Sequence, residues 1–146
     1  MTVRILLADD HALFRGALRM VLELEPDLEV VAEAENGQQV LACIGATRPD
    51  VVCMDLNMPG LDGLQTTRAL QHQSPTVRVI GLSAHVDLVR VADLLDAGAL
   101  GYVLKGSAVT ELIAAIRCAS RNESYLSPDL GLHSPDALAA YRSPKN

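Results

Sequence analysis

The chain has 146 residues, of which 49% are hydrophobic and 21% charged. This length fits one domain with a short appendage, and the composition excludes an intrinsically disordered chain. The formal net charge of −6 argues against a surface that binds a nucleic-acid backbone by itself.

Apolar runs typical of strands alternate along the chain with stretches of helical spacing. The strands are expected at Val3–Ala8, Leu28–Ala34, Asp50–Asp55, Val77–Leu82 and Leu100–Leu104. A helix face is indicated by Phe14, Ala17, Leu18, Val21 and Leu22, and further helices are expected at Gln38–Ala46, Asp62–Gln71, Val86–Ala97 and Ala108–Ser120. Five strands alternating with five helices predict an α/β fold, a doubly wound parallel sheet with helices on both faces.

The pattern changes after about Arg121. Residues 122–146 carry prolines and serines and little periodic apolar content, which predicts a linker or tail behind a folded domain of residues 1–121. Ser134 and Pro135 suit the start of a short helix that would run to Arg142.

Two absences bear on location. No apolar run approaches the length that crosses a membrane, and the first one ends at Asp9–Asp10 rather than continuing as a signal peptide. The three cysteines, Cys43, Cys53 and Cys118, are widely spaced, which predicts reduced thiols rather than a disulfide or a zinc site. We therefore expect a cytoplasmic chain.

Charged side chains stand where the predicted strands end. Asp9 and Asp10 follow the first strand, Asp55 ends the third, and Lys105 follows the fifth. In open parallel sheets the carboxyl ends of the strands form the ligand site, so these groups are expected to converge. Three carboxylates repel one another unless a cation joins them, and a divalent ion with a phosphoryl group would balance this edge.

These motifs together resemble a response-regulator receiver domain, from Met1 to about Arg121. The resemblance rests on Asp9-Asp10, Asp55 with Met58-Pro59-Gly60-Leu61-Asp62-Gly63 behind it, Ser83-Ala84, and Lys105, in order after the correct strands. The segments Ala97–Lys105 and Tyr125–Pro128 further resemble the class whose receiver precedes a LuxR/NarL-type helix-turn-helix. The resemblance implies a flavodoxin-like sheet of strand order 2-1-3-4-5.

The resemblance also implies a phosphorylation site. A sensor histidine kinase would phosphorylate Asp55, and Mg²⁺ would be held by Asp10, Asp55 and the backbone carbonyl of Asn57, with support from Asp9. Mg²⁺ prefers such oxygen ligands.

Three further residues receive roles from the resemblance. Lys105 and Ser83 would contact phosphoryl oxygens and assist the transfer, and Ser83 with Tyr102 would form a switch. The output would be homodimerisation, or control of a DNA-binding domain that this chain does not include; the chain is then either a piece of a longer transcription regulator or a stand-alone receiver.

Each site residue also has a purely structural interpretation. Asp9 and Asp10 suit the N-terminus of a helix, Lys105 could be a solvated lysine, Ser83 a turn serine and Tyr102 an ordinary core residue. The four histidines show no metal-binding spacing, and solvated loop positions are expected for His11 and His85.

Two alternative functions remain open from the sequence. A Mg²⁺-dependent phosphohydrolase of the haloacid-dehalogenase type would use Asp55 as nucleophile, but it needs a second acid where this chain has Asn57. A degenerate receiver would act through protein contacts alone, without phosphate, but the intact set of site residues argues against it. The leading hypothesis is a phosphoacceptor that is not an enzyme acting on other molecules.

Overall fold

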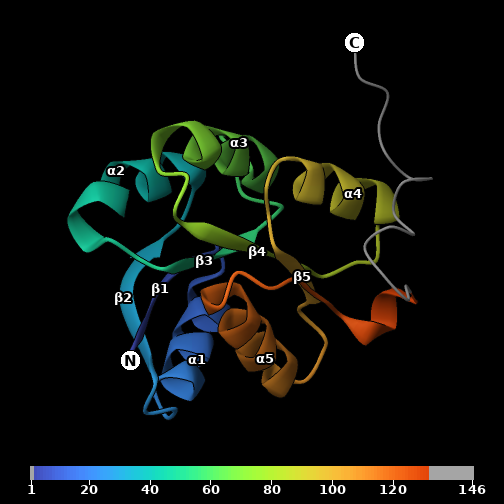
Figure 1. Cartoon of the computed structure of the whole chain (residues 1–146), viewed down its shortest axis with the longest axis horizontal. Helices are drawn as coiled ribbons and strands as arrows, with labels where there is room; N and C mark the ends of the chain where they lie inside the picture. Colours follow the sequence, from blue (N-terminus) through green and yellow to red (C-terminus); the bar gives the residue numbers. More distant parts are fainter. Residues whose placement is uncertain (1, 132–146) are drawn as a thin grey trace.

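A computed structural model describes residues 2–131 of the chain (Figure 1). Within this range all strands belong to one parallel sheet of order β2-β1-β3-β4-β5-β6. The strands are β1 Val3–Ala8, β2 Leu28–Ala34, β3 Val51–Asp55, β4 Arg78–Ser83, β5 Gly101–Leu104 and β6 Tyr125–Leu126. β3 therefore lies in the middle, with β1 on one side and β4 on the other.

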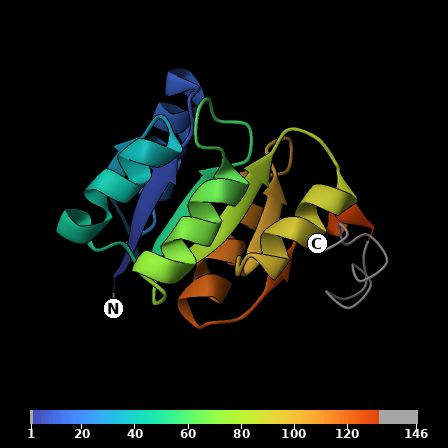
Figure 2. The ribbon, with the colours of Figure 1, turned by 90° about the horizontal axis from the view of Figure 1, so that it is seen from above.

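The helices cover both faces of this sheet. Their bounds are α1 Ala12–Leu22, α2 Gly37–Thr47, α3 Gly63–Gln73, α4 Leu88–Asp96 and α5 Val109–Ser120, followed by the 3₁₀ turn η1 Pro128–Leu130. α1 and α5 lie on one face, and α2, α3 and α4 lie on the other (Figure 1). Figure 2 shows these three helices side by side above the strands.

Alternate side chains of each central strand enter two separate cores. On β1, Ile5 and Leu7 pack with α1 and α5, whereas Leu6 and Ala8 pack with the residues under α2, α3 and α4. All four are at most 1% exposed. Successive strand residues point to opposite faces, so a strand covered on both sides needs apolar residues at every position. This explains the continuous apolar runs in the sequence.

The predicted fold class is confirmed, with one addition. β1 and β2 have the predicted bounds, and the order 2-1-3-4-5 is that of the first five strands. A sixth strand, β6, was not predicted; it pairs with β5 through Gly101 and Tyr102. A strand of two residues between polar residues and Pro128 is too short to show a pattern. The short helix expected over 134–142 lies outside the described residues.

The turn from β3 to α3 brings the helix close to Asp55. Gly60 adopts a left-handed conformation with φ of 72°, whereas Gly63 is needed for space: a Cβ there would lie 2.6 Å from the carbonyl oxygen of Asp55. Asp62 caps α3 in a reciprocal capping box with Gln65. The chain can therefore start a helix directly over the end of β3.

Two further predictions concern membrane segments and thiols. Among residues 2–131, no helix combines the length and apolar character that spanning a bilayer requires. The three cysteines are free, as their spacing predicted. Burial raises the pKa of the Cys53 thiol to about 12, so this residue behaves as an inert core side chain.

Candidate functional site

The carboxyl ends of four neighbouring strands bring the predicted site residues to one edge of the sheet. Asp9 and Lys105 directly follow β1 and β5, while Asp55 and Ser83 are the last residues of β3 and β4. The register places Asp55 beside Leu82 and Ser83 beside Leu104. Parallel pairing thus aligns strand ends that are far apart in the sequence.

Lys105 is the positive partner of two buried acids. Its Nζ lies 2.7 Å from Asp9 Oδ2 and 3.3 Å from Asp55 Oδ2. Asp9 and Asp55 are only 2% and 1% exposed. Although both oxygens lie within ion-pair distance of Lys105, neither accepts a hydrogen bond of acceptable geometry. One ammonium therefore faces two carboxylates and leaves both incompletely neutralised, an arrangement that suits an additional cation.

The environment of Asp55 disfavours its charged form. Burial raises the pKa of the Asp55 carboxyl, and the nearby Asp9 raises it further. The backbone N–H of Asn57, which donates to Asp55 Oδ1 at 3.0 Å, and the charge of Lys105 act in the opposite direction. The net shift is upward because desolvation is the largest effect.

Asp10 and His11 complete the acidic cluster on its solvent side. One ligand atom from each of Asp9, Asp10, His11 and Asp55 lies within 4.8 Å of all the others. The backbone N–H of His11 donates to Asp9 Oδ1 at 2.8 Å, and its ring Nδ1 lies 3.2 Å from the same oxygen and 3.5 Å from Asp10 Oδ1. His11 is exposed, as expected for a loop residue, but its position against two acids was not predicted.

The donor set of this cluster can hold a divalent metal ion. Carboxylate oxygens from two strand ends converge, and the two that face Lys105 are buried without a hydrogen bond. A hard cation with oxygen ligands would complete them. The backbone of Asn57 borders the same position, because its N–H donates to Asp55.

Ser83 and Tyr102 meet at one backbone group. Ser83 Oγ donates to the carbonyl oxygen of His85 and accepts from the His85 N–H, both at 3.2 Å. The Tyr102 hydroxyl donates to the same carbonyl at 3.3 Å, and its ring is fully buried. Burial raises the pKa of the Tyr102 phenol, while its hydrogen bond with Ser83 lowers it. The two predicted switch residues therefore donate to the same acceptor, the His85 carbonyl oxygen in the β4–α4 loop.

Arg90 is a site neighbour that the sequence did not reveal. Its Nη1 donates to Asn57 Oδ1 at 2.7 Å and its Nη2 donates to the Leu56 carbonyl oxygen at 3.0 Å. The residue belongs to α4 and stands 33 positions after Asn57. Attention to strand ends could not find it, because no local pattern distinguishes this arginine from a solvated one.

The loop that carries Lys105 is tied to the segment after α5. Ser127 is 1% exposed and donates to Glu111 Oε1 at 2.9 Å. Ser107 Oγ lies 3.3 Å from Ser127 Oγ and donates to Asp129 Oδ2 at 3.2 Å. Residues Tyr125–Leu130, predicted as part of a linker, therefore pack against the α/β domain in this structure.

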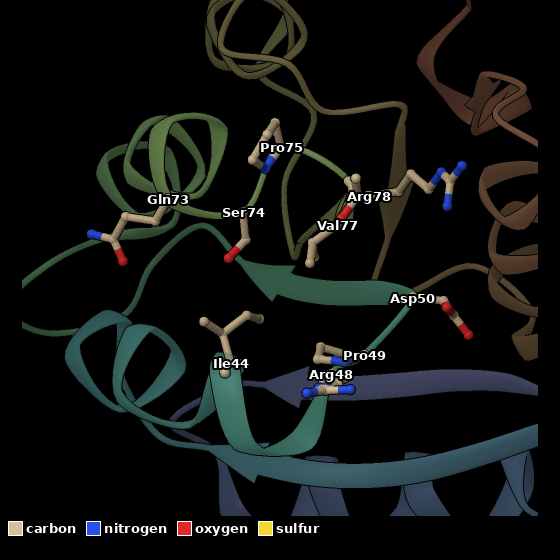
Figure 3. Close-up of a pocket in the computed structure, with 11 residues that line it drawn as sticks. Ile44, Arg48, Pro49, Asp50, Gln73, Ser74, Pro75, Val77 and Arg78 are labelled. Carbon is tan, nitrogen blue, oxygen red and sulfur yellow. The ribbon is translucent and has the colours of Figure 1, made fainter.

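A separate hollow of about 530 Å³ lies at the opposite end of the sheet (Figure 3). Residues of the α2–β3 and α3–β4 connections line it, and Ile44 and Ser74 point toward each other across it. It contains none of the predicted site residues. The acidic cluster and Lys105 lie at the other end of the strands.

Comparison with protein families gives a match over most of the chain. The family model of the response regulator receiver domain matches residues 5–117. This range contains all the predicted site residues.

Two relatives illustrate the class of protein that the chain resembles. It is 38% identical over 126 residues to the transcriptional regulatory protein DegU of Brevibacillus brevis, covering 86% of this chain and 53% of that protein. It is 39% identical over 124 residues to the transcriptional regulatory protein LiaR of Bacillus subtilis, covering 85% of this chain and 59% of that protein. The chain therefore spans little more than half the length of these relatives.

Solved structures show the same fold. A LuxR-family two-component response regulator from Aurantimonas sp. superposes with a TM-score of 0.86 at 34% identity, covering 90% of this chain and 94% of that one. The signal receiver domain of the response regulator NarL from Mycobacterium tuberculosis gives a TM-score of 0.80 at 37% identity, covering 84% and 98%.

Proposed function

The chain belongs to the response regulator receiver family of two-component signalling, and from this premise we propose that Asp55 accepts a phosphoryl group from a sensor histidine kinase. The observation that carries the proposal is the position of Asp55. It is buried at the end of the central strand, its Oδ2 accepts no hydrogen bond, and Lys105 Nζ lies 3.3 Å from that oxygen. An acid with one oxygen free of hydrogen bonds and a lysine ammonium beside it suits the role of phosphoacceptor.

Asp10, Asp55 and the Asn57 backbone carbonyl would hold Mg²⁺, and Asp9 would support it. The converging oxygens and the two buried oxygens without hydrogen bonds fit this ion. When bound, Mg²⁺ neutralises negative charge on the acids and on the phosphoryl oxygens. Phosphoryl transfer depends chiefly on positioning and charge neutralisation, and the remaining parts are supplied by side chains of this chain.

Lys105 and Ser83 would contact the transferred group. Lys105 is already within ion-pair distance of Asp55, so its ammonium can neutralise a phosphoryl oxygen attached there. Ser83 now donates to the His85 carbonyl. A charge-assisted bond to a phosphoryl oxygen is stronger than this neutral one, so the Ser83 hydroxyl would turn toward Asp55.

Tyr102 would transmit this change to the face formed by α4, β5 and α5. Its ring is already buried, so it need not move inward. When Ser83 leaves the His85 carbonyl, Tyr102 would keep its own hydrogen bond to that carbonyl, and the β4–α4 loop would rearrange around it. We propose that the resulting surface controls homodimerisation, or a DNA-binding output domain in a longer protein of the kind its relatives represent.

The domain division is also part of the proposal. Residues 1–121 would form the receiver, and residues 122–146 would lead toward an output domain. The comparisons support the receiver and not a phosphohydrolase. Asn57 stands where such an enzyme needs its second acid, and its side chain is bound to Arg90.

The test is phosphorylation by a small donor. With acetyl phosphate and Mg²⁺, intact mass spectrometry should show one added phosphoryl group on the wild-type chain and none on Asp55→Asn. Labelling that persists in Asp55→Asn, or that is complete in EDTA, would refute the assignment.

Ser83→Ala is the matched variant that separates chemistry from switching. It should still be phosphorylated, but its sedimentation should respond less than that of the wild type to beryllofluoride, a phosphoryl mimic. The coupling at stake is of the usual allosteric size, about 1–3 kcal/mol. Equal shifts in both proteins would show that the signal does not pass through Ser83.

A further inference from the structure

Arg90 connects helix α4 to the loop that follows the phosphoacceptor strand. Its guanidinium makes two short hydrogen bonds to consecutive residues, one to the Leu56 backbone carbonyl and one to the Asn57 side chain. A planar guanidinium that donates to two fixed acceptors holds them in one relative geometry, which a lysine ammonium cannot reproduce. Arg90 is therefore a two-point clamp on the Leu56–Asn57 segment.

The fold of α4 does not require this clamp. The helix is anchored to the core by Val91, Ala92 and Leu94, each at most 2% exposed. Its N-terminus is capped by Asp87, which accepts from the Arg90 backbone N–H. The backbone of Arg90 thus serves the helix, while its side chain extends away to a different loop.

The Leu56–Asn57 segment directly follows Asp55 in the chain and is hydrogen-bonded to its side chain. The Asn57 N–H donates to Asp55 Oδ1 at 3.0 Å, and the carbonyl of the same residue is the proposed backbone ligand of the ion. A shift of this residue would change both the hydrogen bond that orients Asp55 and the position of that ligand. The clamp also engages Asn57 Oδ1, which fixes the direction of the amide.

The charge of Arg90 also reaches the other side of the site. It lowers the pKa of the Tyr102 phenol, in opposition to burial, which raises it. Arg90 therefore contacts the loop after β3 and also acts electrostatically on a residue of the proposed switch.

We propose that Arg90 is a positioning residue that holds the Leu56–Asn57 segment in the arrangement needed to bind the divalent ion, and that through this clamp helix α4 controls the affinity of the site. The proposal rests on the function proposed above. Because coupling is reciprocal, a partner or a second copy that pulls α4 away would weaken ion binding, and ion binding would favour the clamped position of α4.

An effect of the Arg90 charge alone would change the Mg²⁺ affinity in the opposite direction from an effect of positioning. If Arg90 acted only through its positive charge, its removal would leave the acidic cluster more attractive to a cation, and Mg²⁺ would bind more tightly. If Arg90 positions a ligand, its removal weakens binding despite the more favourable charge. The sign of the change therefore distinguishes the two explanations.

The experiment is calorimetric titration of the metal-free 146-residue chain with Mg²⁺. Arg90→Ala should bind Mg²⁺ about tenfold more weakly than the wild type, which is the lower end of the effect of residues that orient metal ligands. Arg68→Ala on α3 is the control, because it removes the same charge from an exposed position, and its affinity should not fall. Arg90→Ala that binds as tightly as the wild type, or more tightly, would overturn the proposal.

Two additional measurements keep the test informative. Arg90→Lys keeps the charge but not the two-point geometry, so its Mg²⁺ affinity should lie between those of the wild type and Arg90→Ala. This variant also provides the test if Arg90→Ala does not fold. Wild-type affinity in Arg90→Lys would overturn the clamp. In EDTA, the Asn57 amide should exchange with solvent faster in Arg90→Ala than in Arg68→Ala, and equal rates would also count against it. None of these readouts uses phosphorylation, so the failure of Asp55 to accept a phosphoryl group would be seen separately.

Discussion

The acids at the ends of β1 and β3 and the acids around Arg117 differ in how their charges are neutralised. Arg117, on α5, donates from Nε and Nη2 to the two carboxylate oxygens of Asp27 at 3.0 and 2.8 Å, and from Nη2 to Glu25 at 3.0 Å. These side chains are more than a third exposed. Asp9 and Asp55 are buried, share one lysine, and each keep an oxygen without a hydrogen bond.

The carboxyl groups of Asp27 and Asp55 have pKa shifts of opposite sign. Hydrogen bonding to Arg117 lowers the pKa of the Asp27 carboxyl and raises that of the guanidinium. Burial raises the pKa of Asp55. The first cluster joins α5 to the α1–β2 connection and its acids are paired with Arg117. In the second cluster, two acids share one lysine, and we propose that a divalent cation completes the neutralisation. Buried, incompletely neutralised charge thus distinguishes the proposed functional cluster from the cluster around Arg117.

The largest expected effect is stabilisation of the folded state by Mg²⁺ bound at the cluster of Asp9, Asp10 and Asp55, and not at the cluster around Arg117. A ligand that binds only the folded state stabilises it by about 2.7 kcal/mol at one hundred times its dissociation constant. Mg²⁺ should therefore raise the melting temperature of the wild type, measured by calorimetry. Asp10→Ala should abolish this rise and Arg117→Ala should retain it. An unchanged rise in Asp10→Ala would place the ion elsewhere.

The second effect is the cost in stability of the buried Asp55 charge in the metal-free protein. The pKa of Asp55 is raised in the folded state, so the stability of the fold falls as the pH rises above the ordinary value of 3.8, and the loss is complete above the raised pKa. Asp55→Asn removes the charge and keeps an oxygen for the Asn57 N–H. In EDTA at pH 7 it should increase the free energy of unfolding by about 0.5–2 kcal/mol, the usual size of a stabilising substitution. Urea denaturation measures this, and equal or lower stability would show that Lys105 already compensates the charge.

The convergence of Asp9, Asp55 and Lys105 was predictable because they occupy positions that the sequence marks. Asp9, Asp55 and Lys105 each interrupt an apolar run at a strand end, and parallel strands must bring such ends together. The bounds of β1 were equally accessible, since a strand buried on both faces leaves a nearly continuous apolar segment.

Three features that the sequence did not reveal are created by tertiary contacts. Arg90 looks like any arginine on an exposed turn of a helix until α4 is placed beside the β3–α3 loop. β6 is two residues long and is recruited by the free edge of β5, which no local pattern shows. The contact of Ser107 with Ser127 likewise joins residues that become neighbours only in the folded chain.

The smallest expected effect belongs to the exposed cluster and has the opposite pH dependence. The folded-state pKa of Asp27 lies below its usual value of 3.8, so its ion pair with Arg117 contributes stability above that value and loses it as the pH falls through the lowered pKa. Asp27→Asn should therefore be slightly less stable than the wild type at pH 7, and the difference should vanish in strong acid.

Salt should reduce the same difference, because exposed ion pairs are screened at high ionic strength. Urea denaturation of both proteins at pH 7 and in acid, each at low and high salt, measures this. A difference that persists in acid would mean that Asp27 contributes through its hydrogen bonds or packing rather than through its charge. That outcome would remove the contrast with Asp55, whose neutralisation is expected to stabilise the fold at neutral pH.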